Sequence, residues 1–284
     1  MRILITGGKG MLGRTLLRHW RDAHTCFIAD LPETDLTDAQ ATENAIEQAQ
    51  PDVVVHCAAM THVDGCESNR ARAFLLNETA TANVARATAA HGARLIAIST
   101  DYVFAGDQPG DRKETDATHP KTVYGASKLA SEEAVRALCP NHIIARTAWL
   151  YGTGGPSFVH TMMTLAAANP LRTLQIVDDQ HGNPTSADAV ADALTAILAR
   201  PDLTGTFHLT CEGVATWYEF AQTIFRLAGY NDLTLIPCSS KEFQRPAQRP
   251  KWSALSKAKL KSVGLPKMPP WQEALMRFIR HEWK

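Results

Sequence analysis

Tyr124 and Lys128 are the residues of this sequence whose types and spacing most directly suggest chemistry. They stand four residues apart, so on a helix they share one face, one turn from each other. A tyrosine phenol titrates near ~10, and a neighbouring lysine cation favours the phenolate and lowers that pKa. The tyrosine could then act as a general acid or base. A half-buried tyrosine beside a solvated lysine is the structural alternative.

Thr100 and Asp101 stand at the carboxyl end of a predicted strand, Arg94–Ser99. Open α/β sheets place their ligands at this end of their strands. The Thr100 hydroxyl could hydrogen-bond a substrate carbonyl oxygen and orient it toward a phenol; the alternative is a cap of the strand end. Because Tyr124 is near the start of a helix predicted over Thr122–Leu138, its hydroxyl is expected to face the same crevice.

A glycine-rich turn lies near the start of the chain. The run Arg2–Thr6 is typical of a buried parallel strand, and a helix is predicted over Met11–Arg21. Gly7, Gly10 and Gly13 connect them in a GxxGxxG spacing. Such glycines permit a tight turn, a close approach to a pyrophosphate and close helix–strand packing, in that order. The turn therefore predicts dinucleotide binding, with a plain turn as the alternative.

Asp30 ends a second predicted strand, Thr25–Ala29. A carboxylate there can hydrogen-bond the ribose hydroxyls of a cofactor, which favours NADH because a 2′-phosphate would be repelled. A turn or helix-cap role is the alternative. The next loop carries Asp35 and Leu36, which we expect under the adenine. A Thr37-x-x-Gln40 capping box predicts the start of the following helix, Thr37–Gln50.

Small residues follow the third predicted strand, Asp52–His56. In Cys57–Thr61 they would let a cofactor lie against the backbone, although tight helix packing would also favour them. An alanine-rich helix is predicted over Glu67–His91. Within it, Asn77 either holds a bend or a water, or lies exposed at the surface.

The composition is that of an ordinary globular protein. The 284 residues are 45% hydrophobic and 20% charged, with a formal net charge of 0, which does not favour nucleic-acid binding. No apolar run reaches the ~20 residues that span a bilayer, and the first residues do not form a signal peptide. We therefore expect a cytoplasmic protein without membrane contact. The scattered cysteines are expected to be reduced core thiols, and no metal-site spacing is present.

Five strand-then-helix units predict a doubly wound parallel sheet, the Rossmann architecture, over residues 1–150. Strand alternation weakens near residue 150. Residues 151–284 are therefore predicted to form a smaller α/β domain, mainly for substrate binding, from which some segments return to the first domain. The loop 105–121 is a candidate lid, or a solvated loop.

These segments resemble the extended short-chain dehydrogenase/reductase family, and within it the dTDP-4-dehydrorhamnose reductases. The glycine loop at 7–13, STDYVFAG at 99–106 and VYGASKLASE at 123–132 carry the resemblance. Further matching runs are HCAAMTHVDGCES at 56–68, RTAWLYG at 146–152, DDQHGNPT at 178–185 and RPKWS at 249–253. The similarity thus extends over nearly the whole chain.

The resemblance implies that NADPH or NADH reduces the C4 ketone of a dTDP-sugar, dTDP-4-dehydro-β-L-rhamnose. Tyr124 would supply the proton, Lys128 would bind the nicotinamide ribose and Thr100 would hold the ketone oxygen. The expected cofactor-binding residues are Gly7, Gly10, Met11, Leu12, Gly13, Asp30, Asp35, Leu36, Ala58, Ala59, Met60, Thr61, Tyr124 and Lys128. The expected substrate-binding residues are Thr61, Val63, Thr100, Asp101, Trp149, Asn183 and Arg249, the last with a guanidinium suited to phosphate.

Alternatives stay open at this point. Another NDP-4-keto-6-deoxysugar reductase or epimerase could use the same scaffold, as could a non-catalytic regulatory subunit. Thr100 is followed by Asp101-Tyr102 rather than by the Asp-Glu pair of the dehydratases. The first helix, around Thr15, offers no carboxylate for the metal-bridged dimer of some members. The expected assembly is a monomer or a homodimer, and the choice between NADPH and NADH is open.

Overall fold

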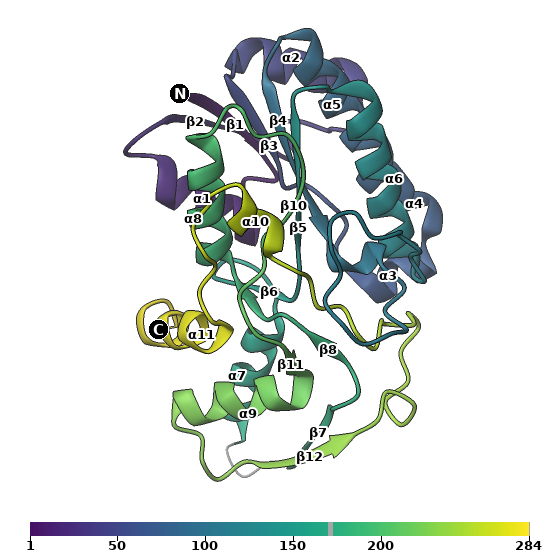
Figure 1. Ribbon diagram of the computed structural model, residues 1–284, viewed down its shortest axis with the longest axis vertical. Coiled ribbons are helices and arrows are strands. Elements are labelled where there is room, and N and C mark those ends of the chain that lie inside the picture. Colours follow the sequence, from purple (N-terminus) through teal and green to yellow (C-terminus); the bar gives the residue numbers. More distant parts are fainter. Residues whose placement is uncertain (170–172, 284) are drawn as a thin grey trace.

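The computed structural model describes residues 1–169 and 173–283, and its centre is a parallel β-sheet (Figure 1). The strands run in the order β10-β5-β4-β3-β1-β2, and each neighbouring pair is parallel. They are β1 (Arg2–Thr6), β2 (Thr25–Ala29), β3 (Val53–His56), β4 (Arg94–Thr100), β5 (His142–Thr147) and β10 (Gly205–His208). The predicted doubly wound sheet is confirmed.

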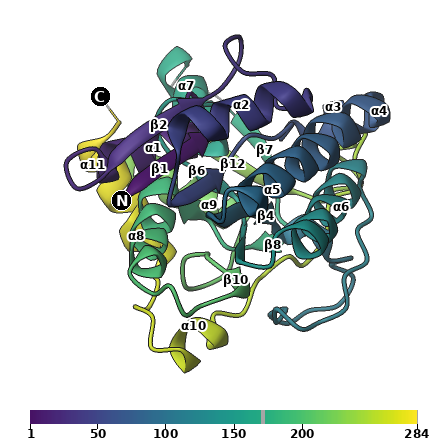
Figure 2. The same cartoon turned by 90° about the horizontal axis from the view of Figure 1, so that it is seen from above.

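Helices cover both faces of this sheet (Figures 1 and 2). Ile3 and Ile5 of β1 share a buried core with α1 and α8, whereas Leu4 between them joins a second core with α2, α5 and α6. This is the alternation that a strand covered on both faces requires. The helices are α1 (Met11–Trp20), α2 (Ala39–Ala49), α5 (Ala80–Ala90), α6 (Val123–Leu138) and α8 (Ala187–Leu198).

The second half of the chain builds a smaller layer beyond the carboxyl ends of the strands, and also returns to the sheet (Figure 1). Strand β10 pairs with β5, and α8 packs on α1, so both belong to the large sheet although they follow residue 150. The smaller layer contains β6 (Leu150–Tyr151), α7 (Phe158–Ala168), β7 (Thr173–Val177), β8 (His181–Gly182), β9 (Thr185–Ser186), β11 (Ala215–Thr216), α9 (Trp217–Ala228) and β12 (Thr234–Cys238). Two more helices are α10 (Ala258–Ser262) and α11 (Trp271–His281).

The single helix predicted over Glu67–His91 is wrong, because the chain forms three shorter helical segments before α5. It forms α3 (Val63–Ser68), α4 (Arg70–Phe74) and a π-helical turn, η1 (Leu75–Thr79). The side chain of Asn69 interrupts the first two by accepting a hydrogen bond from the Arg72 backbone N–H at 3.0 Å.

The capping box predicted at Thr37 is also wrong. Asp38 caps α2 instead, and its carboxylate accepts hydrogen bonds from the backbone N–H groups of Gln40 at 2.8 Å and Ala41 at 3.0 Å. A carboxylate is a good acceptor for these orphan donors, which explains why Asp38 rather than Thr37 caps the helix. At α9, by contrast, Thr216 and Glu219 form a reciprocal capping box.

Within residues 1–169 and 173–283, no helix is long and apolar enough to cross a membrane. The same residues hold no group of His, Cys, Asp and Glu side chains arranged for a metal ion. The six cysteines are unpaired thiols.

Candidate active site

The hydroxyls of Thr100 and Tyr124 meet at the carboxyl edge of the sheet. Thr100 ends β4, and its side chain lies close enough to the Tyr124 phenol to lower its pKa, while its hydroxyl donates to the Asp101 carboxylate at 2.9 Å. Tyr124 stands in the first turn of α6, which Thr122 caps by accepting a hydrogen bond from the Gly125 backbone N–H at 3.0 Å. The Tyr102 ring packs edge-on against the Tyr124 ring, with 5.7 Å between centroids. The helix start and the strand end therefore fix this pair together.

Burial raises the pKa of Tyr124 well above its ordinary value, and the nearby Thr100 side chain opposes this rise only in part. Desolvation therefore decides the net direction, and the lowering of this pKa by Lys128 stays a prediction. The Tyr124 phenol keeps its proton at neutral pH. It is consequently suited to donate a proton rather than to remove one.

Lys128 lies one turn further along α6 and is buried, with 3% of its surface exposed. Burial lowers the pKa of its ammonium group to about 8, although the Glu132 carboxylate favours the charged form. The neighbouring His56 stays neutral, because burial and the Lys128 charge lower its pKa to about 3. At neutral pH Lys128 is therefore positively charged, and it lies one helical turn from Tyr124 on α6.

The glycine turn fits a dinucleotide cofactor. Gly7 has a φ of 66°, and a Cβ there would come within 2.6 Å of the Ala58 backbone nitrogen. A Cβ at Gly13 would come within 2.4 Å of the Gly7 carbonyl oxygen. Gly10 begins α1 without a capping side chain, and the first turn contains no acidic residue. The N-terminus of α1 is thus left to interact with an anion, as a pyrophosphate requires.

The two residues that follow Gly10 differ in exposure. Leu12 is buried in the core between the sheet and α8, while Met11 is half-buried and faces Gly152, where a Cβ would lie 3.2 Å from Met11 Cγ. A direct contact with a cofactor is therefore open to Met11. The Leu12 side chain packs the helix that carries this turn, so only its backbone N–H, in the first turn of α1, is available to a cofactor.

Asp30 holds the glycine turn against the end of β2. Its carboxylate accepts hydrogen bonds from the backbone N–H groups of Lys9 and Leu31, each at 2.9 Å. The Lys9 ammonium group forms an ion pair with Glu33 at 2.6 Å. A carboxylate that could bind ribose hydroxyls, at the end of β2, therefore lies next to a glycine-turn cation that could bind a 2′-phosphate.

Of the next two expected cofactor contacts, Asp35 is exposed and Leu36 is buried. The exposed Asp35 carboxylate caps its own loop by accepting hydrogen bonds from the Thr37 backbone N–H at 2.9 Å and hydroxyl at 2.7 Å. Leu36 is buried in the core with α2 and α5. Leu36 thus supports the loop from below rather than presenting its side chain to solvent.

Asn77 anchors the small-residue loop after β3. This side chain is wholly buried in η1, donates to the Met60 carbonyl at 3.1 Å and accepts from the Met60 backbone N–H at 2.7 Å. It also donates to the Ser127 hydroxyl of α6 at 2.8 Å. Surface exposure, one of the alternatives in the sequence, is therefore wrong. Ala58 and Ala59 are half-buried and Thr61 is exposed on this anchored loop.

Trp149 leaves β5 in a left-handed backbone conformation, with a φ of 47° that is uncommon for a bulky residue. Its indole stacks on that of Trp217, with 3.5 Å between ring centroids and 4° between planes. Gly182 makes room for it, since a Cβ there would lie 2.4 Å from Trp149 Cε2. Strain of this kind gathers at functional sites, and the surrounding packing maintains it here.

Asn183 is among the expected substrate contacts, but its side chain is used within the protein. It is wholly buried, and its amide donates to the Gly213 carbonyl at 2.6 Å and accepts from the Leu255 backbone N–H at 2.8 Å. Both ends of the amide are thus used within the protein. The sequence shows a polar residue in a turn but not the two distant segments that enclose it.

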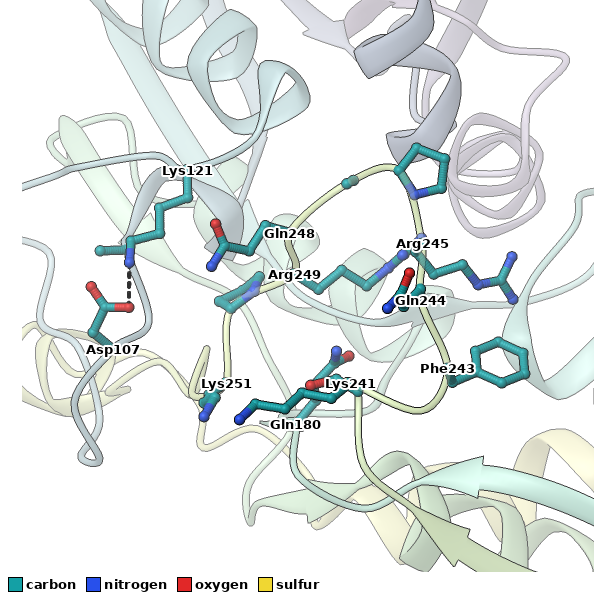
Figure 3. A pocket seen from close by; sticks show the side chains of 15 residues that line it. Asp107, Lys121, Gln180, Lys241, Phe243, Gln244, Arg245, Gln248, Arg249 and Lys251 are labelled. Carbon is teal, nitrogen blue, oxygen red and sulfur yellow. Dashed lines mark hydrogen bonds and ion pairs between the residues drawn. The ribbon is translucent and has the colours of Figure 1, made fainter.

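A cationic cleft of about 490 Å³ opens beside these residues (Figure 3). Its basic lining residues are Lys121, Lys241, Arg245, Arg249 and Lys251, and its acidic one is Asp107, which pairs with Lys121. Such a lining attracts a phosphate-bearing ligand although the whole chain has a net charge of 0. Of these cations only Arg249 is among the expected site residues, because isolated lysines in a loop give no pattern in the sequence.

Arg249 connects the cleft with the start of α3. Its guanidinium pairs with the Asp64 carboxylate at 3.0 Å and makes a hydrogen bond with the Tyr102 side chain. Val63, half-buried, begins the same helix. The wholly buried Asp101 follows Thr100, and burial raises the pKa of its carboxyl to about 6, although the Thr100 hydroxyl donates a hydrogen bond to it at 2.9 Å.

Comparison with known proteins agrees with this geometry. The chain matches the family described as RmlD substrate binding domain over residues 1–283. It is 41% identical over 281 residues to a dTDP-4-dehydrorhamnose reductase of Streptomyces griseus, covering 96% of this chain and 91% of that protein. A probable dTDP-4,6-dihydroxy-2-methyloxan-3-one 4-ketoreductase of Streptomyces antibioticus is 38% identical over 277 residues, covering 97% and 93%.

Among solved structures, the dTDP-4-dehydrorhamnose reductase of Bacillus anthracis in complex with NADP superposes with a TM-score of 0.95. The two chains are 36% identical, and the match covers 98% of each. Fold, site geometry and sequence similarity thus lead to the same assignment. The chain belongs to the dTDP-4-dehydrorhamnose reductase family, within the extended short-chain dehydrogenases/reductases.

Proposed function

We propose that this protein reduces the C4 ketone of dTDP-4-dehydro-β-L-rhamnose to dTDP-L-rhamnose, with NADPH or NADH as the hydride donor. The observation that supports this most directly is the meeting of the Thr100 and Tyr124 hydroxyls with the buried Lys128 one turn away. These are the groups that a ketone needs when it becomes an alcohol. Family membership and the NADP-bound relative favour the same reaction.

The cofactor, when bound, supplies the hydride, and the glycine turn with the N-terminus of α1 would hold its pyrophosphate. Thr100 orients the ketone oxygen. Tyr124, which keeps its proton at neutral pH, donates that proton to the oxygen as negative charge develops there. The Lys128 cation then stabilises the phenolate that remains, and its position on the same helix face allows it to bind the nicotinamide ribose as well.

The cationic cleft would bind the nucleotide diphosphate of the substrate. Arg249 is its best-placed member, because a guanidinium can bind phosphate oxygens through two parallel hydrogen bonds. Its pairing with Asp64 holds the fork in place until a phosphate competes for it. Trp149, fixed by its stacking on Trp217, would form the wall beside the sugar.

A second candidate is reduction of a different dTDP-linked 4-keto-6-deoxy sugar, which the Streptomyces antibioticus relative favours. Purely regulatory binding is disfavoured by the complete set of Thr100, Tyr124 and Lys128. The test is oxidation of NADPH or NADH by the protein with each keto-sugar supplied separately. A higher kcat/KM for dTDP-4-dehydro-β-L-rhamnose supports the first proposal, and a preference for another 4-keto sugar supports the second.

We further propose a cytoplasmic protein that is a monomer or a homodimer, with residues 151–284 mainly in the substrate domain. Strand β10 and helix α8 are the parts of that range that join the large sheet. Light scattering of the purified protein tests the assembly, and a mass of two chains would favour the homodimer.

A further inference from the structure

Glu132 lies one helical turn beyond Lys128 on α6, and its side chain is only 1% exposed. Its Oε1 accepts hydrogen bonds from Ser99 Oγ at 2.6 Å and from Arg146 Nε at 2.8 Å. Its Oε2 accepts from Arg146 Nη2 and from Arg136 Nη2, both at 2.7 Å. One carboxylate therefore joins α6 to β4 through Ser99 and to β5 through Arg146.

These three elements carry or neighbour the reacting groups. Ser99 directly precedes Thr100 in β4, and Arg146 stands opposite Ser99 in the register of β4 and β5. Glu132 shares its helix with Tyr124 and Lys128. A change in the Glu132 contacts would shift the end of β4 relative to the start of α6, and thus the Thr100 hydroxyl relative to the phenol.

Glu132 also provides the negative charge that favours the Lys128 cation. The other titratable groups facing Lys128 are His56 and Cys57 at the end of β3 and Tyr124 on α6. His56 stays neutral with a pKa of about 3, and Cys57 stays protonated because burial raises its pKa to about 12. The Tyr124 phenol likewise keeps its proton.

Arg146 is held by the same carboxylate and has few other partners. The neighbouring His208 of β10 lies 3.4 Å from Arg146 Nη1 and is neutral, because burial lowers its pKa to about 3. The Phe104 ring lies 5.0 Å from the guanidinium carbon. Removing Glu132 would leave two buried positive charges, those of Lys128 and Arg146, without the carboxylate that compensates both.

We infer that Glu132 is a positioning residue for the reduction: it aligns Thr100 with Tyr124 through Ser99, and it keeps Lys128 charged. The inference rests on the proposed function, because it assigns Glu132 to the same site. Glu132 acts only through these three residues, so it is not itself a catalytic residue.

The test is the pH dependence of kcat for E132Q. Lys128 acts as a cation, so activity is highest below its pKa and declines as pH rises through it. Removing the Glu132 charge lowers that pKa, so the alkaline limb of the profile moves to lower pH. Each unit of this shift reduces the charged fraction of Lys128 about tenfold on the alkaline side. An alkaline limb of E132Q that coincides with that of the unchanged protein would overturn the inference.

A double variant without either charge distinguishes the effect of Glu132 on the reaction from its effect on the stability of the fold. E132Q leaves Arg146 buried without its carboxylate, which destabilises a fold, whereas E132M/R146M removes both charges and replaces them by apolar side chains. The double variant is expected to fold, by circular dichroism, and still to show the shifted alkaline limb. A folded double variant with the original pH profile would contradict the inference. R136A is the matched control, because it removes only the more exposed partner and should leave the profile in place.

Cofactor binding gives a readout that does not depend on the sugar. NADPH fluorescence titrations from neutral to alkaline pH should show binding weakening at lower pH in E132M/R146M than in the unchanged protein. If the unchanged protein binds NADPH but reduces no keto-sugar, the proposed function fails, while this titration still decides the role of Glu132. Equal pH dependence in both proteins would count against it.

Discussion

Gly125 lies directly against the backbone carbonyl of Tyr102: a Cβ at Gly125 would come within 2.2 Å of that oxygen. This contact brings the first turn of α6 onto the segment that follows Thr100. The nearness of the Thr100 and Tyr124 hydroxyls therefore depends on a missing side chain as well as on the polar groups themselves.

Gly125→Ala is expected to push α6 away from η2 (Asp101–Val103), since a backbone carbonyl cannot rotate aside. The change should lower the free energy of unfolding by about 1–3 kcal/mol. Because a misplacement near 1 Å can reduce turnover on the order of 10²-fold, kcat should fall while the protein still folds. Thermal unfolding and steady-state kinetics measure both effects. Ala134→Gly weakens the same helix by about 1 kcal/mol without this contact and should leave kcat near its original value.

Asp30→Ala is expected to shift cofactor preference toward NADPH. The substitution removes a carboxylate that repels a 2′-phosphate, while the Lys9 cation remains on the neighbouring glycine turn. The ratio of kcat/KM for NADPH to that for NADH should rise. Asp22→Ala, an exposed acid before β2, should leave the ratio unchanged. An equal ratio in the Asp30 variant would show that this carboxylate does not distinguish the two cofactors.

Asp101→Asn is expected to stabilise the fold at neutral pH. The folded-state pKa of Asp101 is raised to about 6, above its ordinary 3.8, so the folded protein binds this proton more tightly than the unfolded chain does. Its contribution to stability is therefore greatest below pH 4 and is lost as pH rises to about 6. At pH 7 the charged form costs ~3 kcal/mol, which an amide avoids. The gain in unfolding temperature should be present at pH 7 and absent near pH 4; a gain of equal size at both would contradict this account.

The sequence predicts the elements well where one local rule decides them. Helices α7 and α8 are examples, because a capping serine, Ser157 or Ser186, precedes an apolar pattern in each. The site edge is predictable for a similar reason, since parallel strands end together and place Thr100 near the start of α6.

Other features depend on distant segments and leave no local signal. Asn183 is enclosed by Gly213 and Leu255, which are far from it in the chain. The high pKa of Tyr124 comes from burial under several elements, which the spacing to Lys128 does not reveal. The cationic cleft likewise gathers lysines and arginines from separate loops.

Tyr124→Phe is expected to reduce turnover by roughly two to four orders of magnitude, the usual contribution of a general acid. The ring and its packing on Tyr102 are kept, so the variant should fold and bind NADPH as before. Tyr230→Phe provides the matched control, because that hydroxyl is remote from Thr100 in the fold. Near-normal turnover in the Tyr124 variant would remove this residue from the mechanism.

The most direct test of the whole account is the stoichiometry of the reaction. The protein is incubated with dTDP-4-dehydro-β-L-rhamnose generated in situ and with NADPH or NADH, and both the oxidised cofactor and the sugar product are quantified. The account predicts one dTDP-L-rhamnose for each cofactor oxidised, and loss of both in the Tyr124→Phe variant. Cofactor that binds but is not oxidised by this keto-sugar would contradict it.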